Sequence, residues 1–133
     1  MIEAGMQYTV EKVVTKEMTA AAVGGKDAVM ALGTPFLVAM FEDAAVELMK
    51  PHLEPGQGSV GTKIVIKHLA PTPVGMKVRV TATVTEVDRK RLEFSIEAFD
   101  EVEKIGEGTE QRFIISQDKF RQGVEMKAAK AAQ

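Results

Sequence analysis

The pattern of apolar and polar positions begins with alternation, changes to helical spacing in one segment and then returns to alternation. Residues 34–50 carry apolar side chains around a narrow polar stripe, with Thr34 suited to the N-cap, Pro35 to the first helical position and Pro51 beyond the end. Other segments alternate or cluster β-branched residues as strands do, and they lie at residues 7–16, 60–70, 76–87, 91–100 and 104–115. The pattern therefore predicts one strand, one helix and then four strands.

The order of these elements predicts an α+β fold. The breaks "DRK" and "EVE" between the last three strands are short enough for an antiparallel meander. One apolar helix followed by strands with a single apolar face indicates an antiparallel β-sheet wrapped around one central α-helix. Such a sheet has two open edges, and a long edge strand can pair with a second copy, so we expect a homodimer.

Two segments fit neither pattern. Residues 17–32 have no clean period and contain a Gly-Gly pair, which predicts a mobile connection of the kind that often forms a lid. The chain from Phe120 onward is polar and alanine-rich, so we do not assign it to the core. We expect a single domain at residues 1–120 and a polar C-terminal tail at 121–133.

Composition narrows the classes of function. The 133 residues include 17 basic and 19 acidic side chains, and this balance argues against a nucleic-acid-binding protein. Without cysteine and with two histidines, the chain has no thiolate zinc site, and we expect no metal or other cofactor. No apolar run approaches the roughly 18 residues that span a bilayer, and the first residues lack the signal-peptide pattern, so we expect a cytoplasmic protein without a membrane partner.

Glu42 interrupts the apolar part of the helix. Asp43, Glu47 and Lys50 form the solvent stripe, and Glu42 lies about 100° around the helix from Asp43. No basic residue stands three or four positions away, so the helix offers the carboxylate no partner. A buried carboxylate at this position needs a partner elsewhere in the fold.

His68 is a polar residue on an apolar strand face. With a period of two, one face of strand 60–70 consists of Val60, Thr62, Ile64, Ile66 and His68. We expect this face to meet the helix, where His68 could partner Glu42. The less specific interpretations remain open, because border glutamates often reach water, lone histidines are often structural, and capping alone explains Thr34.

Two further positions suit binding as well as structure. Arg112 fits a cross-strand salt bridge or an anion contact. Gly61 allows close approach of the backbone, at a bulge or at the wall of a ligand site. The second histidine, His52, follows Pro51 at the helix end, where a partial negative charge suits an imidazolium, and we interpret it as structural.

Residues 33–84 and 91–115 resemble the fluoroacetyl-CoA thioesterase group of the hotdog superfamily, in the threonine at the helix start, the glutamate eight residues later, "LEPGQGSVGT" and "HLAPTPVG". The resemblance implies a dimeric hotdog fold in which Thr34, Glu42 and His68 match the family's catalytic residues. It further implies that the backbone at Gly61 and the side chain of Arg112 occupy substrate-binding positions. A water attack and a covalent acyl intermediate are both compatible with these residues.

The resemblance also implies the substrate class, an acyl-CoA thioester. In the fluoroacetyl-specific enzyme the segment before the helix is a longer lid with aromatic residues, whereas "AAAVGGKDAVMAL" here is shorter and has none. We therefore expect hydrolysis of a small or short-chain acyl-CoA. The alternatives are a hotdog enoyl-CoA hydratase and a non-catalytic acyl-CoA-binding dimer, since one fold hosts many functions.

Overall fold

The structure, a computed structural model, describes residues 1–25 and 27–133, so that position 26 of the predicted connection lies outside it. In chain order the elements are β1 (Gln7–Val13), the 3-10 helix Lys16–Met18, α1 (Ala20–Gly24), α2 (Thr34–Met49), the 3-10 helix Lys50–His52, β2 (Gln57–His68), β3 (Lys77–Asp88), β4 (Arg91–Phe99), β5 (Lys104–Ser116) and α3 (Gln117–Ala131).

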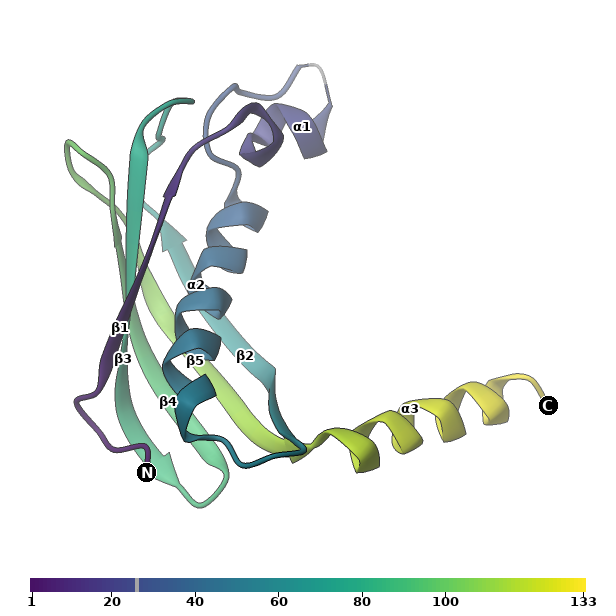
Figure 1. Ribbon diagram of the computed structural model, residues 1–133. Coiled ribbons are helices and arrows are strands. Elements are labelled where there is room, and N and C mark those ends of the chain that lie inside the picture. The colour runs from purple at the N-terminus through teal and green to yellow at the C-terminus, as the bar shows by residue number, and fades with distance from the viewer. Residues whose placement is uncertain (26) are drawn as a thin grey trace.

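The five strands form one antiparallel sheet in the order β1-β3-β4-β5-β2. The sheet curves, and α2 lies along its concave side (Figure 1). Strands β3, β4 and β5 are neighbours in sequence and in space, which confirms the predicted meander. The edge strands of the sheet are β1, which precedes α2 in the sequence, and β2, which follows it. The outer edge of β2 is therefore available for pairing with another strand.

The core lies between α2 and the concave face of the sheet. The buried face of α2 consists of Leu37, Met40, Phe41, Ala44, Ala45, Leu48 and Met49. On the sheet, alternate residues are buried, as in the row Val78, Val80, Ala82 and Val84 of β3. Each large apolar side chain buried in this way contributes about 1.5–3 kcal/mol, so this layer fixes the position of α2 against the sheet.

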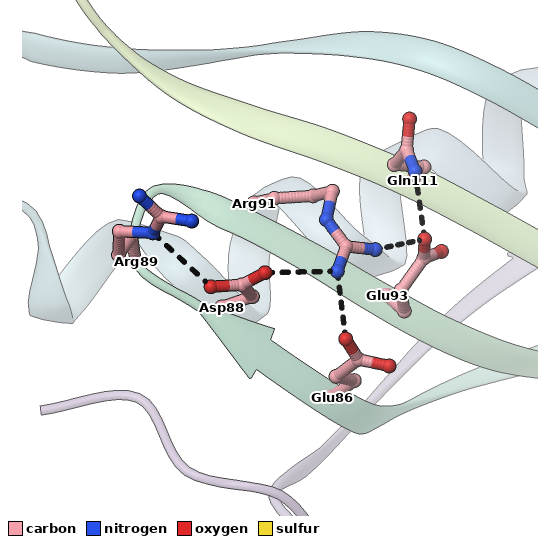
Figure 2. A network of polar contacts seen from close by, with 6 residues as sticks. All are labelled: Glu86, Asp88, Arg89, Arg91, Glu93 and Gln111. Carbon is pink, nitrogen blue, oxygen red and sulfur yellow. Dashed lines mark hydrogen bonds and ion pairs between the residues drawn. The ribbon is translucent and has the colours of Figure 1, made fainter.

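The opposite face of the sheet is polar and is tied together by Arg91 (Figure 2). Its guanidinium donates to Glu86 at 2.7 Å, Asp88 at 3.3 Å and Glu93 at 2.8 Å. Glu93 also accepts a hydrogen bond of 2.7 Å from the Gln111 amide. These contacts link β3, β4 and β5 on the side away from the core, where partly exposed ion pairs add little stability.

A β-bulge in β2 changes which residues face the helix. The register with β5 shifts between Gly61 and Lys63. The prediction that Thr62 and Val60 face the helix is wrong, because a bulge inserts one residue and reverses the alternation before it. The Thr62 hydroxyl instead donates to the side-chain oxygen of Gln111, at 2.8 Å, on the polar face.

The polar segment at the C-terminus forms a helix. Helix α3 leaves the end of β5 and extends away from the sheet (Figure 1). The Ser116 side chain caps it by accepting from the Lys119 backbone N–H at 3.4 Å, and none of its residues is buried. Alanine, lysine, glutamate and glutamine favour helix even without packing, so composition explains both its helicity and its exposure.

Candidate active site

Thr34 and His68 meet where α2 begins and β2 ends. The Thr34 Oγ1 atom lies 2.8 Å from His68 Nδ1. The prediction that Thr34 caps the helix is wrong, because Gly33 is the N-cap residue and its carbonyl accepts the first helical N–H groups, from Phe36 and Leu37. The Thr34 hydroxyl is therefore not engaged in capping and points to the imidazole.

The imidazole of His68 is half-buried, and this burial favours its neutral form. Burial lowers the pKa of His68 from its usual value of 6.5, with a smaller opposing effect from the backbone of Ala70. Its Nε2 atom is buried and has no hydrogen-bond partner in the part of the chain that the structure describes. With the proton on Nε2, the neutral ring accepts a hydrogen bond at Nδ1 from the Thr34 hydroxyl.

This pair borders an apolar cleft of about 320 Å³. Its walls include Ala20, Val29, Ala31, Leu32, Thr34, His68, Leu69, Ala70 and Pro71. The first three residues come from α1 and the segment that follows it, so the predicted lid region forms one wall. The exposed Thr34 hydroxyl thus reaches a small apolar space, which suits an acyl group better than a charged one.

Glu42 lies on the same helix but binds a different partner. Its Oε2 atom is 3.4 Å from Nη1 of Arg112, and its side chain is 47% exposed. Arg112 is buried on β5 and donates from Nε to the Ser59 hydroxyl at 3.0 Å and from Nη2 to the Ser59 carbonyl at 3.1 Å. The expected contact with His68 is replaced by this ion pair.

Gly61 leaves room beside that ion pair. A Cβ atom at this position would lie 3.2 Å from Arg112 Nη1 and 3.5 Å from Glu42 Oε2. A side chain there would crowd the arginine, whereas the glycine leaves exposed backbone next to both charges. The structure thus brings together Gly61, Arg112 and Glu42.

Glu110 is a buried acid that the sequence analysis did not select. Its side chain is 1% exposed, and its Oε2 atom lies 3.2 Å from Arg112 Nη1. Burial raises the pKa of Glu110 to about 7, against the opposing pull of the Arg112 charge. The alternation of residues in β5 could have identified Glu110, because Glu110 and Arg112 stand two residues apart and therefore share the face toward α2.

The site residues thus form two groups within one chain, Thr34 with His68 and Glu42 with Arg112 and Gly61. Eight residues separate Thr34 from Glu42, which corresponds to about 12 Å along the helix axis. No hydrogen bond or ion pair joins Glu42 to His68 among residues 1–25 and 27–133. The same residues hold no cluster of three or more His, Cys, Asp or Glu side chains suited to a metal ion.

Comparison with known proteins identifies the family. The family model described as fluoroacetyl-CoA-specific thioesterase, FlK, matches residues 14–118. The chain belongs to this family. Membership of the FlK family confirms the resemblance noted in the sequence and makes the protein a thioester hydrolase.

Individual members of the family agree with this assignment. The chain is 45% identical over 94 residues to the fluoroacetyl-CoA thioesterase of Streptantibioticus cattleyicolor, covering 71% of this chain and 68% of that protein. The solved structure of the fluoroacetyl-CoA thioesterase FlK superposes with a TM-score of 0.92 at 36% identity, over 96% of this chain and 98% of that one. The sequence match and the structure match therefore identify the same family.

A more distant solved structure confirms the hotdog fold. The hot-dog-like protein from Thermanaerovibrio acidaminovorans gives a TM-score of 0.88 at 25% identity, over 95% of this chain and 93% of that one. In the described part of this FlK-family chain, no helix has both the length and the apolar character to cross a membrane.

Proposed function

We propose that the protein hydrolyses short-chain acyl-CoA thioesters, with Thr34 and His68 as the reacting pair and Glu42 as a further acid–base group. The observation that carries this proposal is the 2.8 Å contact between the Thr34 hydroxyl and His68 Nδ1 at the border of an apolar cleft. A hydroxyl bound to a neutral imidazole is the arrangement that activates an attacking oxygen. Family membership supports the same reaction class.

The pair can activate water through the threonine. Thr34 gives its proton to His68 Nδ1 and takes one from a water molecule, whose oxygen attacks the thioester carbonyl. The C–S bond then breaks, and the thiolate of CoA takes up the proton from His68, so that free acid and CoA leave. If Thr34 itself attacks, an acyl ester forms on Thr34, and mass spectrometry of protein quenched during turnover detects the added acyl mass.

A second copy of the chain completes the site in this proposal. Acid–base groups must lie within hydrogen-bond reach of the reacting atoms. Thr34 and Glu42 lie about 12 Å apart along one helix, so within one chain they cannot both reach the same reacting atoms. Glu42 and Gly61 lie beside the open edge strand β2, where a second chain can pair. We infer that a homodimer places Glu42, Gly61 and Arg112 of one chain near Thr34 and His68 of the other.

The walls of the cleft support a short aliphatic acyl group as the substrate. Ala20, Val29, Ala31 and Leu32 are small or medium-sized, and none of the described residues that line the space is aromatic. An apolar pocket distinguishes substrates by only about 1–3 kcal/mol per methylene group, so several short chains should be accepted. Fluoroacetyl-CoA should have no large advantage over acetyl-CoA.

A panel of acyl-CoA esters tests the proposed function. We expect release of free CoA thiol from acetyl-, propionyl- and butyryl-CoA, with fluoroacetyl-CoA within about tenfold of acetyl-CoA in kcat/KM. Crotonyl-CoA should be hydrolysed with release of free CoA thiol, and should not merely lose the absorbance of its conjugated enoyl group. Calorimetric binding of these esters without thiol release would identify a binding module, and hydration of crotonyl-CoA without thiol release would identify a hydratase.

Replacing Thr34 by alanine separates its chemical role from a structural one. Because Gly33 is the N-cap, Thr34→Ala should change the free energy of unfolding by less than about 0.5 kcal/mol while lowering kcat/KM for acetyl-CoA. Thr34→Ser, which keeps the hydroxyl, should retain most of the activity. A stability loss of about 1 kcal/mol, typical of a removed cap, would instead show that the hydroxyl supports the helix.

A further inference from the structure

Glu110 lies in an apolar part of the helix-facing row of β5. Its neighbours directly across the strands are Ile64 of β2 and Phe94 of β4, both apolar. The Oε1 atom of Glu110 is buried and has no hydrogen-bond partner among the described residues. An ionised carboxylate in this position therefore depends on its other oxygen, and on Arg112, for compensation.

Arg112 is shared between two carboxylates. Its Nη1 atom lies 3.2 Å from Glu110 Oε2 and 3.4 Å from Glu42 Oε2. The other two guanidinium nitrogens are held by Ser59, so the group is fixed in one orientation. One cation thus faces two acids, and the triplet has a net charge of −1 when both are ionised.

We infer that Glu110 is a positioning residue for the proposed hydrolysis, which competes with Glu42 for Arg112 and thereby sets how firmly Arg112 holds the Glu42 carboxylate. This inference rests on the proposed role of Glu42. When Glu110 carries a proton, the positive charge of Arg112 is available to Glu42 alone. When Glu110 is ionised, that charge is divided, and Glu42 is freer to act as a base.

The surroundings of Glu110 place the change between its protonated and ionised forms near neutral pH. Burial raises the pKa of Glu110 to about 7, while the Arg112 charge lowers it and the Glu42 charge raises it. The charged groups that face Glu110 are Arg112 on its own strand and Glu42 on α2, since Ile64 and Phe94 are apolar. On the β2 row the other titratable group is His68, which lies beyond Ile64 at the strand end.

The raised pKa of Glu110 determines how the pairing of Arg112 with Glu42 changes with pH. Below about pH 7 Glu110 binds a proton and Arg112 pairs with Glu42 alone, whereas above it the charge of Arg112 is divided between Glu42 and the ionised Glu110. Glu110→Gln keeps the size of the side chain but can never ionise. The variant therefore behaves at every pH as the parental protein does under acidic conditions.

The ratio of the two rates across pH tests the inference. We expect kcat/KM for acetyl-CoA to be equal in the parental protein and Glu110→Gln at about pH 5.5, and roughly three- to tenfold lower in the variant at about pH 8.5. Effects of His68 on the rate cancel in the ratio. A ratio that stays constant between these pH values would overturn the inference, because a purely structural role does not depend on the protonation of Glu110.

Glu107→Gln is the matched control for this experiment. Glu107 lies on the same strand three residues earlier, on the opposite face, where it pairs with Lys104. It lies on the face of β5 opposite Arg112, so its variant should follow the parental rate at each pH. A pH-dependent ratio in this control as well would assign the effect to a general loss of negative charge and overturn the role of Glu110.

A titration that needs no activity distinguishes this inference from the proposed function. The carboxyl carbon of Glu110, assigned in a 13C NMR spectrum by its absence in Glu110→Gln, should titrate near pH 7 in the parental protein. In Glu42→Gln the midpoint should move to lower pH, because one competitor and its negative charge are gone. An unchanged midpoint would overturn the competition, whether or not the protein releases CoA from any thioester.

Discussion

Replacing His68 by alanine is expected to lower kcat/KM for acetyl-CoA by about 10²- to 10⁴-fold, the usual contribution of a positioned base. The imidazole Nδ1 lies 2.8 Å from the Thr34 hydroxyl, and its Nε2 atom is buried beside the cleft. Without it, the hydroxyl has no group to accept its proton. The measurement is the rate of CoA thiol release, with the melting temperature recorded beside it.

The second histidine supplies the control for that substitution. His52 lies in the 3-10 turn after α2 and is exposed, so His52→Ala should keep the parental rate. The parental rate should fall as the pH decreases below 6.5, because His68, whose pKa is lowered, then gains a proton and no longer accepts from Thr34. His68→Ala should lose this acidic limb, and equal rates in His68→Ala and the parental protein would refute the assigned base.

Replacing Glu42 by glutamine is expected to lower kcat/KM by about 10²- to 10⁴-fold without disrupting the proposed dimer. The substitution keeps the shape of the side chain and its ability to accept from Arg112, but removes the charge and the basicity. Asp43→Asn is the control, because Asp43 is the next residue on α2, is exposed and forms an ion pair with Lys12, at 3.7 Å. Full activity in Glu42→Gln would contradict the acid–base role and leave Glu42 only as a binding partner of Arg112.

Mixing two inactive variants tests whether Glu42 acts across the proposed dimer. When Glu42→Gln and His68→Ala chains exchange freely at equal amounts, half of the dimers are mixed, and each mixed dimer contains one site with both residues intact. About a quarter of the parental activity should return. If both groups acted within one chain, no mixed dimer would hold an intact site and no activity would return.

Much of the fold was predictable because its signals are local. The prolines at positions 35 and 51 bracket α2, whose observed bounds are Thr34–Met49, and alternation placed each strand within a few residues of its observed ends. The β3-β4-β5 meander followed from turns too short for any other connection. Two features were not predicted, the bulge at Gly61, which shifts the register without a change in composition, and helix α3, which buries none of its residues.

The candidate site was predictable in its members but not in its pairings. Polar residues on apolar faces pointed to Glu42 and His68, yet the partner of each depends on long-range geometry. Glu42 lies about 12 Å further along α2 than Thr34, the partner of His68, and β5 brings Arg112 to Glu42 instead. Glu110 was missed because a glutamate in a strand is usually assigned to solvent, and only the register with Ile64 and Phe94 shows that it is buried.

A double-mutant cycle in Thr34 and His68 tests most directly whether these two residues form one reacting unit. The quantity measured is kcat/KM for acetyl-CoA in the parental protein, Thr34→Ala, His68→Ala and the double variant. Because the hydroxyl acts through Nδ1 at 2.8 Å, the double variant should be no slower than His68→Ala alone. If the two losses multiply instead, the residues act independently and the proposed pair does not exist.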